Sequence, residues 1–472
     1  MSQDQKMAFA LFFGNRGFFP ASLIAEARET LPAVLTEMGY DSIILQEEAT
    51  RYGAVETASE GKVYAEFLRK HQGQYDGVIL CLPNFGDENG AVTALKDAGV
   101  PILVQAYPDE LDKMSPALRR DAFCGKLSVT DVFRQYGVKY TTLKPHVVHP
   151  QSQAFKENVD HFARVCRVVK GVNGMTVGAI GARTTPFKTV RIDELTLQKY
   201  GITVETIDMA EVIHRIHQLP IDEVFEKKSL QLQQSASFEG VPDDAFANIV
   251  KLSVVVDQII EEYEMDAVAI RCWIELQQQL GISPCVAMGV LNDGGFAAAC
   301  EVDIGSAIAM HALHLASEQP SACLDWNNNY ADEEEKCILF HCGPIPLSMM
   351  KEKGKVVDHA ILANSVGEGC SFGPNVGRIS PFPFTFGNVL TENGKMKWYF
   401  GKGEFTKDPV PEDFFGCAGV AEISQLEDVL MHIVRTGHRH HVNITKGDHQ
   451  AVMQEALGYY LNQCISIPQK EQ

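Results

Sequence analysis

The stretch that decides the fold is Ala267–Leu313, AVAIRCWIELQQQLGISPCVAMGVLNDGGFAAACEVDIGSAIAMHAL. It contains two mostly apolar runs, Ala267–Trp273 and Phe296–Cys300, and each run predicts a strand. Apolar residues then recur at helical spacing after Asp303, which predicts a helix. Carboxylates follow both predicted strands, at Glu275 and Asp303. Ligands bind at the carboxyl ends of strands in open α/β sheets, so these acidic groups could converge on one point.

Strand-like and helical segments alternate on the N-terminal side of this stretch. Strands are predicted at Met7–Phe13 and Thr176–Ile180, each with helical segments further along. Such alternation is typical of parallel sheets with helices on both faces. From about residue 321, short apolar runs separated by Gly, Pro and Asn favour antiparallel strands. The sequence therefore predicts an α/β protein with two doubly wound parallel-sheet domains, residues 1–168 and 169–320, followed by an antiparallel β-barrel-like domain, residues 321–472.

Composition excludes several classes of partner. The 472 residues carry a formal net charge of -20, so nucleic acid or an anionic lipid surface would repel the chain. No apolar run approaches the roughly 20 residues of a membrane-spanning helix, and the N-terminus lacks the pattern of a signal peptide. The twelve cysteines form no CxxC pair, as expected for reduced thiols. We therefore expect a cytoplasmic protein that binds neither nucleic acid nor membranes.

A third candidate ligand lies far along the chain. A strand is predicted around His441 and Asn443, which share a face. Two carboxylates and one imidazole form a hard, oxygen-rich set that suits Mn²⁺ or Mg²⁺ better than Zn²⁺. Glu275 and Asp303 also have structural interpretations, because a carboxylate suits the first turn of a helix and Asp is a good N-cap. Glu301 shares a strand face with Asp303 and is the alternative second carboxylate.

The sequence resembles the L-fucose isomerase family, within the wider fucose/arabinose isomerase group. CEVDIGSAIAM, with Asp303, resembles the family segment that carries a metal-binding aspartate. HHVNITKGDH, with His441, resembles the segment that carries the metal-binding histidine. Glu275 matches the position of the family's catalytic glutamate, and GNRG matches a loop whose arginine, here Arg16, enters the sugar site of a neighbouring subunit. The chain is shorter than the best-known L-fucose isomerases, mainly in its C-terminal part.

The resemblance implies a metal-dependent aldose–ketose isomerase that acts on a six-carbon sugar by an ene-diol mechanism. Glu275 and Asp303 would be catalytic, and with His441 they would hold Mn²⁺, or another divalent cation such as Mg²⁺ or Co²⁺. The residues implied to bind the sugar are Arg16, Trp273, His341 and Asn443. The implied assembly is a homo-oligomer, commonly a hexamer in the family.

The resemblance leaves the substrate open between two kinds of sugar. One is an L-fucose-like aldose. The other is the 6-sulfonated sugar sulfoquinovose, which would become 6-deoxy-6-sulfofructose. Arg16, Arg183 and Lys188 offer an anion site for a sulfonate group.

Two alternative functions stay open at this point. Tandem flavodoxin-like domains also serve as non-catalytic sugar-binding sensors, which need no metal. An epimerase or aldolase could use the same metal site with an additional acid or base. A dehydrogenase is rejected, because the GAIGAR motif that ends the predicted strand Thr176–Ile180 lacks GxGxxG spacing.

Overall fold

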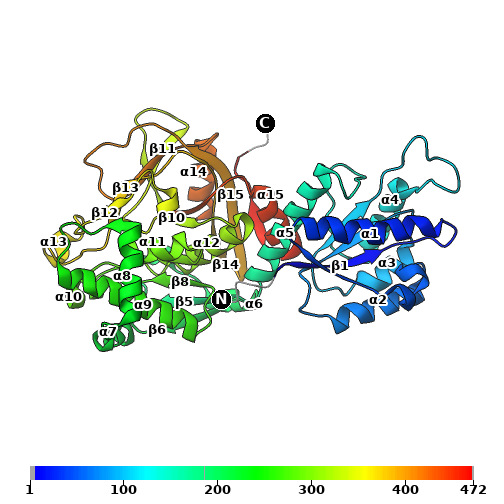
Figure 1. The fold of residues 1–472 in the computed structure, drawn as a ribbon. Coiled ribbons are helices and arrows are strands. Elements are labelled where there is room, and N and C mark those ends of the chain that lie inside the picture. Colours follow the sequence, from blue (N-terminus) through cyan, green and yellow to red (C-terminus); the bar gives the residue numbers. More distant parts are fainter. Residues whose placement is uncertain (1–5, 185, 470–472) are drawn as a thin grey trace. The chain divides into compact units, whose positions relative to one another are not determined.

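The computed structural model describes residues 6–184 and 186–469, and the chain divides into two compact units, Met1–Lys170 and Gly171–Gln472. Unit 1 contains a four-stranded parallel sheet in the order β2-β1-β3-β4 (Figure 1). Its strands are β1 (Ala8–Phe13), β2 (Asp41–Ile44), β3 (Gly77–Leu82) and β4 (Ile102–Ala106). Its helices are α1 (Ala21–Glu37), α2 (Ala58–Lys70), α3 (Glu88–Leu95), α4 (Ala122–Gln135) and α5 (Gln153–Val172).

The sheet of unit 1 is covered on both faces because its central strands are apolar along their whole length. Ala10 and Phe12 of β1 pack with residues of α2, α3 and α4, whereas Phe9 and Leu11 pack with residues of α1 and α5. Figure 1 shows α1 and α2 on opposite sides of β1. This is the helix arrangement predicted for the first domain.

Unit 2 begins with a second four-stranded parallel sheet, in the order β6-β5-β8-β9. Its strands are β5 (Thr176–Ile180), β6 (Thr203–Ile207), β8 (Ala267–Ile270) and β9 (Ala297–Cys300). The helices of this part are α6 (Glu194–Lys199), α7 (Met209–Gln218), α8 (Glu223–Ser235), α9 (Asp243–Glu262), α10 (Glu275–Leu280), α11 (Cys285–Asp293) and α12 (Ile304–Ser317). The strand pair and the helix predicted within Ala267–Leu313 are therefore confirmed.

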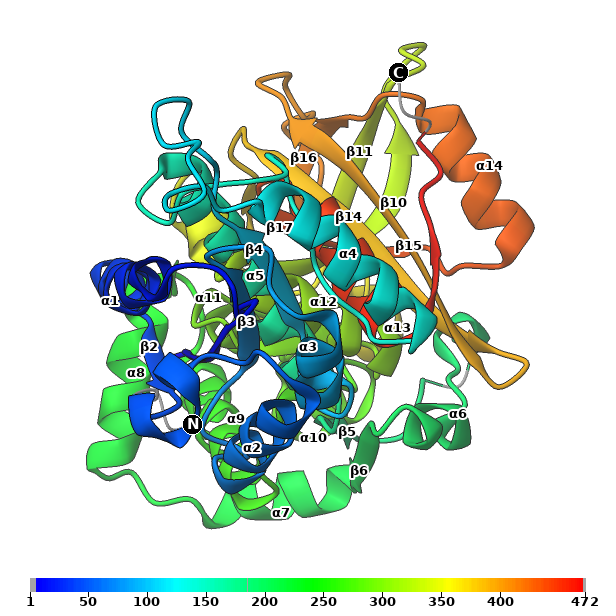
Figure 2. The same cartoon turned by 90° about the vertical axis from the view of Figure 1, so that its right-hand side faces the viewer.

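The rest of unit 2 is dominated by a ten-stranded sheet, in the order β18-β15-β14-β17-β10-β11-β16-β13-β12-β7. Its strands are β7 (Ala236–Ser237), β10 (Ser321–Asn329), β11 (Lys336–His341), β12 (Gly354–Val356), β13 (Asn375–Arg378), β14 (Pro383–Glu392), β15 (Lys395–Phe405), β16 (Cys417–Glu422), β17 (His441–Lys446) and β18 (Cys464–Ser466). The accompanying helices are α13 (Ala363–Val366), α14 (Leu426–Thr436) and α15 (Gln450–Met453). Figure 2 shows β10, β11 and β16 side by side.

This C-terminal sheet is mixed, which corrects the prediction of a purely antiparallel one. Its centre is antiparallel, but β7 with β12, β13 with β16, and β15 with β18 pair in parallel. A further two-residue pairing joins β15 to β16. The barrel-like closure and the division into three domains stay predictions. Among the residues described, no helix is both long and apolar enough to cross a membrane.

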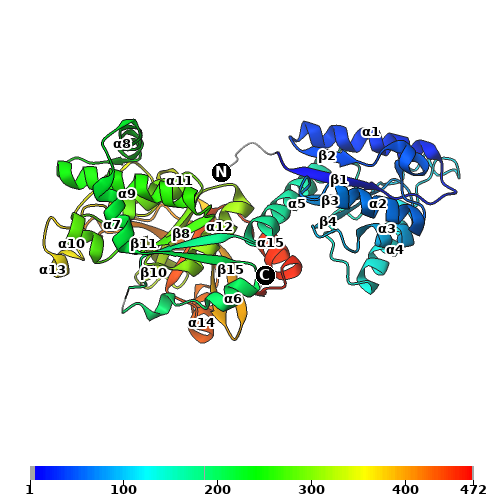
Figure 3. The ribbon, with the colours of Figure 1, turned by 90° about the horizontal axis from the view of Figure 1, so that it is seen from below.

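Helix α12 is the element that links the two sheets of unit 2. It packs against β5, β8 and β9 of the parallel sheet and against β10, β14 and β17 of the mixed sheet. Its residues are almost all buried, which explains why its sequence is apolar on nearly every side. Figure 3 shows α7, α8 and α9 on one side of unit 2 and α14 on the other. The end of β9, where α12 begins, therefore lies against strands that come much later in the chain.

Candidate functional site

Two neighbouring antiparallel strands bring an aspartate and a histidine together. In the pairing of β10 with β17, Asp325 lies directly opposite His441, and Cys323 lies opposite Asn443. Directly opposed residues point to the same face of a sheet, so these four side chains share one face. Nε2 of the fully buried His441 side chain lies 3.6 Å from Oδ1 of Asp325.

Glu301 reaches the same point from the end of β9, where the chain turns sharply. Glu301 and Val302 both have positive φ angles, 63° and 56°. This left-handed backbone is unfavourable for residues other than glycine, and most of all for a β-branched residue. The turn is held by the Val302 N–H, which donates to the carbonyl oxygen of Ile270 at 3.3 Å. It aims the Glu301 carboxylate at His441, with Oε2 3.0 Å from Nε2.

Three buried atoms lie around the His441 ring: Nε2 of His441 itself, Oε2 of Glu301 at 3.0 Å from it and Oδ1 of Asp325 at 3.6 Å from it. None of them has a hydrogen-bond partner within the described residues. A buried acceptor without a donor is costly, so native structures rarely leave one unless something else occupies the position. Two carboxylates and an imidazole fit a divalent cation such as Mn²⁺ or Mg²⁺. The three residues therefore offer the ligand types that a divalent cation accepts, and Glu301 and His441 also belong to a group of potential ligand atoms that lie within 4.8 Å of one another.

Asp303 holds the other nitrogen of the His441 ring. Its Oδ2 accepts hydrogen bonds from Nδ1 of His441 and Oγ of Ser306, both at 2.7 Å. Its Oδ1 accepts from the N–H of Ser306 at 3.1 Å, as the N-cap of α12, and pairs with Arg439. Burial acts to raise the pKa of this carboxyl, but the Arg439 charge and the hydrogen bond from His441 lower it well below its usual range. Asp303 is an ionised cap whose oxygens already have donors.

The other site groups differ in their electrostatics. Burial raises the pKa of Asp325 to about 6, with His441 acting in the opposite direction. Burial also acts to raise the pKa of Glu301, but His441 lowers it. Burial acts to lower the pKa of His441, but Cys323 and Asp303 raise it well above its usual range. A metal ion would therefore compete with a proton for His441.

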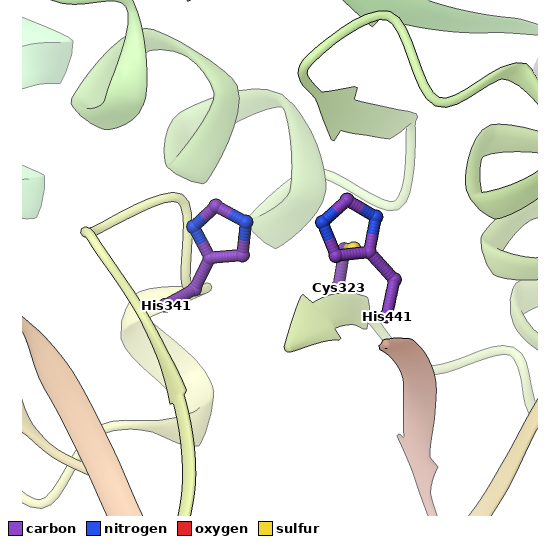
Figure 4. Close-up of side chains that lie close together, drawn as sticks. All are labelled: Cys323, His341 and His441. Carbon is purple, nitrogen blue, oxygen red and sulfur yellow. The ribbon is translucent and has the colours of Figure 1, made fainter. Parts of the chain in front are cut away.

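His341, at the end of β11, presents a further nitrogen to this cluster. Figure 4 shows its ring beside that of His441, with the centroids 5.9 Å apart and the sulfur of Cys323 close to His441. Nδ1 of His341 accepts a hydrogen bond from the N–H of Cys342 at 2.9 Å, so the neutral ring carries its proton on Nε2. Burial lowers the pKa of His341 to about 4, which favours the neutral ring. This Nε2–H is a buried donor with no partner in the described part of the chain.

Two other ligand sets are close enough to be considered. Cys323, His341 and His441 form one, and Glu301, His440 and His441 form the other. Burial raises the pKa of the Cys323 thiol, and the thiolate is the form that binds metal. The lone pair of His341 is already occupied by Cys342. The first set is therefore a poor site, whereas the second shares two members with the Glu301–Asp325–His441 set.

Aromatic side chains extend from the cluster toward Trp273. The ring of His440 lies 4.3 Å from that of His441, and Phe187 lies 5.4 Å from His440. Trp273 lies 5.4 Å from Phe187 in turn, so it is two rings away from His440 rather than beside the three converging atoms. Asn443 directs Nδ2 to Ser306 Oγ at 3.3 Å, while its buried Oδ1 has no partner among the described residues.

Glu275 has different neighbours. It is the first residue of α10, and its Oε2 accepts hydrogen bonds from Nε of Arg271 at 2.5 Å and from the N–H of Ile274 at 3.0 Å. It lines a cavity of about 590 Å³ that also borders Asp208 and His214. Within the described residues, Glu275 belongs neither to the set Cys323, His341 and His441 nor to the set Glu301, His440 and His441. These contacts are those of a carboxylate that stabilises the first turn of a helix, which is the structural interpretation given for Glu275 from the sequence.

Arg16 belongs to unit 1, in the loop that follows β1. Its Nε donates to the carbonyl oxygen of Gly86 at 2.7 Å, and its guanidinium pairs with Glu88 and lies over the ring of Phe85 at 4.5 Å. These contacts fix the arginine against its own unit, with the side chain 26% exposed.

Asp325 is the residue of this candidate site that sequence reasoning did not single out. It lies in a buried strand whose first half, Ser321–Leu324, is apolar enough to be recognised. The polar residues that follow, Asp325–Asn329, suggest a linker instead. The signal was an apolar run ending in a carboxylate, which is the pattern that marks Cys300 and Glu301.

Comparison with known proteins shows which family the chain resembles. The model of the fucose/sulfoquinovose isomerase N-terminal domain matches residues 10–173, and that of the L-fucose isomerase C-terminal domain matches residues 339–467. The sulfoquinovose isomerase of Priestia aryabhattai is 22% identical over 381 residues, which cover 79% of this chain and 81% of that protein. The sulfoquinovose isomerase of Alkalicoccus urumqiensis is 23% identical over 390 residues, covering 81% and 84%.

Proposed function

The chain belongs to the fucose/sulfoquinovose isomerase family, and we propose that it is a metal-dependent aldose–ketose isomerase of a six-carbon sugar. The observation that carries the metal dependence is that unpartnered, buried oxygens of Glu301 and Asp325 lie 3.0 and 3.6 Å from the unpartnered Nε2 of His441. We favour this ligand set over the predicted set of Glu275, Asp303 and His441. The reason is that Asp303 and Glu275 already accept hydrogen bonds, whereas Glu301 and Asp325 each keep a free oxygen.

The chemistry divides between the cation and the chain's own side chains. A divalent cation held by Glu301, Asp325 and His441 would act as a Lewis acid toward two neighbouring sugar oxygens. The carboxylates of Glu301 and Asp325 are the groups that can take a proton from one carbon of the sugar and return it to the next. His341 offers its Nε2–H to a sugar oxygen, and Asn443 offers Oδ1 to a sugar hydroxyl. Burial of these groups excludes water, which strengthens each interaction.

The substrate that we favour is the 6-sulfonated sugar sulfoquinovose, isomerised to 6-deoxy-6-sulfofructose. Support comes from the relatives named sulfoquinovose isomerase, which match most of the chain. Phe187 contacts His440, so the loop that carries Arg183 and Lys188 borders the site and could supply positive charge to a sulfonate. An L-fucose-like aldose is the second candidate. The resemblance to the family also supports a homo-oligomer in which Arg16 reaches the sugar of a neighbouring subunit.

The test is a panel of aldoses, neutral and 6-sulfonated, incubated with protein that has been stripped by a chelator and then supplied with Mn²⁺. We expect the matching ketose in the NMR spectrum only after Mn²⁺ is restored, and faster from the sulfonated sugar. A C2 epimer in place of a ketose would support the epimerase alternative. Full activity in the stripped protein, or binding of sugars without any product, would contradict the proposal.

A further inference from the structure

The outer edge of the parallel sheet in unit 1 is open. Strand β2 stands at the end of the sheet order and, among the described residues, pairs with β1 alone. Ser42, Ile43 and Ile44 of β2 are only partly buried, whereas every residue of β1 is buried. We infer that this edge, together with a groove beside α2, binds an extended acidic segment of a partner protein as an added strand. The inference is independent of the proposed function, because it uses no residue of the candidate metal site.

The first argument is the direction of the peptide groups in β2. The N–H of Asp41 donates to the carbonyl oxygen of Met7 at 3.0 Å, on the side of β1. Because peptide groups alternate in direction along a strand, the N–H and C=O groups of Ser42 and Ile44 point away from β1. An extended guest can pair with such groups, as in other cases of strand addition to a sheet edge. β2 has only four residues, so the main chain offers few hydrogen bonds and side chains have to contribute.

The second argument is a cavity of about 690 Å³ that is lined by the end of β2 and by α2. Its apolar lining includes Leu45, which follows β2, and Val63 and Phe67 of α2. Val63 is 40% exposed, so an apolar guest side chain placed there would remove apolar surface from water. An added strand turns every second side chain toward the same face, and one set of guest side chains would therefore meet this lining.

The third argument is the charge of the groove, which is opposite to that of the whole chain. The chain carries a formal net charge of -20, yet Lys62 and Lys70 of α2 border the cavity. Among the described lining residues the only acid is Glu66, and its carboxylate pairs with Arg69. This charge pattern favours a guest that carries carboxylates, and the net charge disfavours a second copy of this acidic chain.

The spacing of the two lysines predicts the sequence pattern of the guest. Lys62 and Lys70 are separated by eight positions of α2, which is about 12 Å along a helix. An extended strand covers about 3.3 Å per residue, so four residues cover about 13 Å. Carboxylates at positions i and i+4 of the guest would therefore reach both lysines, and an apolar residue at i+2 would face Val63. The expected pattern is an acid, any residue, an apolar residue, any residue and an acid.

The test measures binding of a fluorescently labelled peptide, Thr-Glu-Thr-Ile-Thr-Glu-Thr, to the full chain by fluorescence polarisation. We expect saturable binding that weakens as salt is added, because both lysines are exposed to solvent. Two further peptides carry N-methyl groups, one on the threonines and the other on the Glu and Ile residues. Only alternate N–H groups of an added strand face β2, so one methylated peptide should lose binding and the other should keep most of it. Equal binding by both methylated peptides would overturn strand addition.

The double variant Lys62→Glu with Lys70→Glu should weaken binding about tenfold or more, because like charges then face the guest carboxylates. A peptide with Lys in place of both Glu residues should bind this variant better than the wild type. The matched control is Lys96→Glu with Lys113→Glu, which makes the same change in net charge at two exposed lysines of unit 1 outside the groove. Equal weakening in the two double variants would overturn the assignment of the groove.

Ser42→Pro removes an outward N–H group, a change that edge strands tolerate. It should weaken peptide binding with little change in melting temperature; if it does not fold, the lysine variants and the methylated peptides decide. No saturable binding of the peptide by the wild type would overturn the inference. Self-association of the wild type that Ser42→Pro abolishes, without peptide binding, would assign the edge to a second copy and also overturn it.

Discussion

Both parallel sheets of this protein carry polar residues at the carboxyl ends of their strands, but the hydrogen bonding of these residues differs. At the carboxyl edge of unit 1, Asn15 donates to Glu56, Asn84 donates to Asn15 at 2.5 Å, and Arg16 pairs with Glu88. In unit 2, the carboxylate after β9 is buried and keeps a free oxygen, as does the carboxylate of Asp325 on β10.

The difference teaches which polar residues at a sheet edge mark a site. Position alone does not, because both edges carry carboxylates and amides at the ends of parallel strands. What separates the carboxylates of the two edges is whether each finds a donor within the described residues, since the amide of Gln105 in unit 1 also keeps an unpartnered oxygen. In unit 1 the charged groups satisfy one another, which stabilises the loops. In unit 2, two carboxylate oxygens stay without a donor, and Glu301 and Val302 adopt a left-handed backbone. Both features cost free energy of folding, and such costs are common at functional sites.

The largest effect is expected from Glu301→Gln and Asp325→Asn, which replace a free acceptor with an uncharged amide. Ketose formation should fall about 10²- to 10⁴-fold, the scale of general acid–base catalysis. Metal per chain, measured by mass spectrometry after dialysis, should fall in the same preparations. The stripped Asp325→Asn variant should melt no lower than the stripped wild type, because burial raises the pKa of Asp325 and its costly buried charge is gone. The stripped Glu301→Gln variant should melt somewhat lower, because it also loses the attraction to His441 that lowers the pKa of Glu301. A lower melting temperature with unchanged metal content would mean that these carboxylates are structural.

Arg16→Ala tests whether the satisfied edge of unit 1 also contacts substrate. A charged hydrogen bond to the sugar is worth about 1.5–3 kcal/mol, so kcat/KM should fall about 10- to 100-fold. The ion pair with Glu88 is partly exposed and contributes about 0–1 kcal/mol, so the protein should stay folded.

Glu88→Gln is the control for Arg16, since it removes the ion pair and leaves the guanidinium. Its effect on kcat/KM should be clearly smaller. Mixed oligomers of Arg16→Ala and Glu301→Gln chains should regain activity if one subunit supplies Arg16 to another. Mixtures as inactive as both parents would argue against a shared site.

Glu275→Gln should have a smaller effect than either, with kcat/KM reduced less than about tenfold and Mn²⁺ affinity unchanged. The amide can still accept from Arg271, and at partly exposed pairs the loss of one charge costs about 1 kcal/mol or less. The catalytic role that the resemblance implies for Glu275 predicts instead a loss of about 10²- to 10⁴-fold. Ketose formation and metal content per chain, measured as for Glu301→Gln, decide between the structural and the catalytic role of Glu275.

The contrast between Glu275 and Asp325 also shows how far sequence reasoning reached. The apolar runs and the helical spacing after Asp303 located β8, β9 and α12, because local periodicity reports burial directly. His441 was found through its motif. Asp325 was not, because its position beside His441 depends on the register of β10 against β17. Such a pairing joins residues more than a hundred positions apart, so the apolar run that ends at Asp325 can mark the carboxylate but not its partner. Whether a carboxylate keeps a free oxygen is equally a property of the packed structure.

The smallest expected effect concerns Lys126, a buried cation in unit 1. Unlike Arg16 with Glu88, its ammonium group contacts a backbone carbonyl oxygen. Its residue is 3% exposed, and its Nζ donates to the carbonyl oxygen of His146 at 2.9 Å. Burial lowers the pKa of Lys126 to about 8, from its ordinary value of 10.5. Below pH 8, Lys126 is protonated in both the folded and the unfolded chain, so the buried charge lowers the free energy of unfolding by its full amount. Between these two pKa values the unfolded chain binds more protons, so stability rises with pH.

Lys126→Met keeps the apolar stem and removes the charge. At pH 7 it should stabilise unit 1 by about 1–2 kcal/mol after the loss of one hydrogen bond, seen as a rise of several degrees in melting temperature by scanning fluorimetry. The gain should shrink as the pH is raised from 8 toward 10, because the wild type sheds its buried proton over that range. The exposed Lys62, changed to Met on α2 of the same unit, should show no such trend. A gain that is constant with pH would show that packing, rather than charge, separates Lys126 from the paired groups around it.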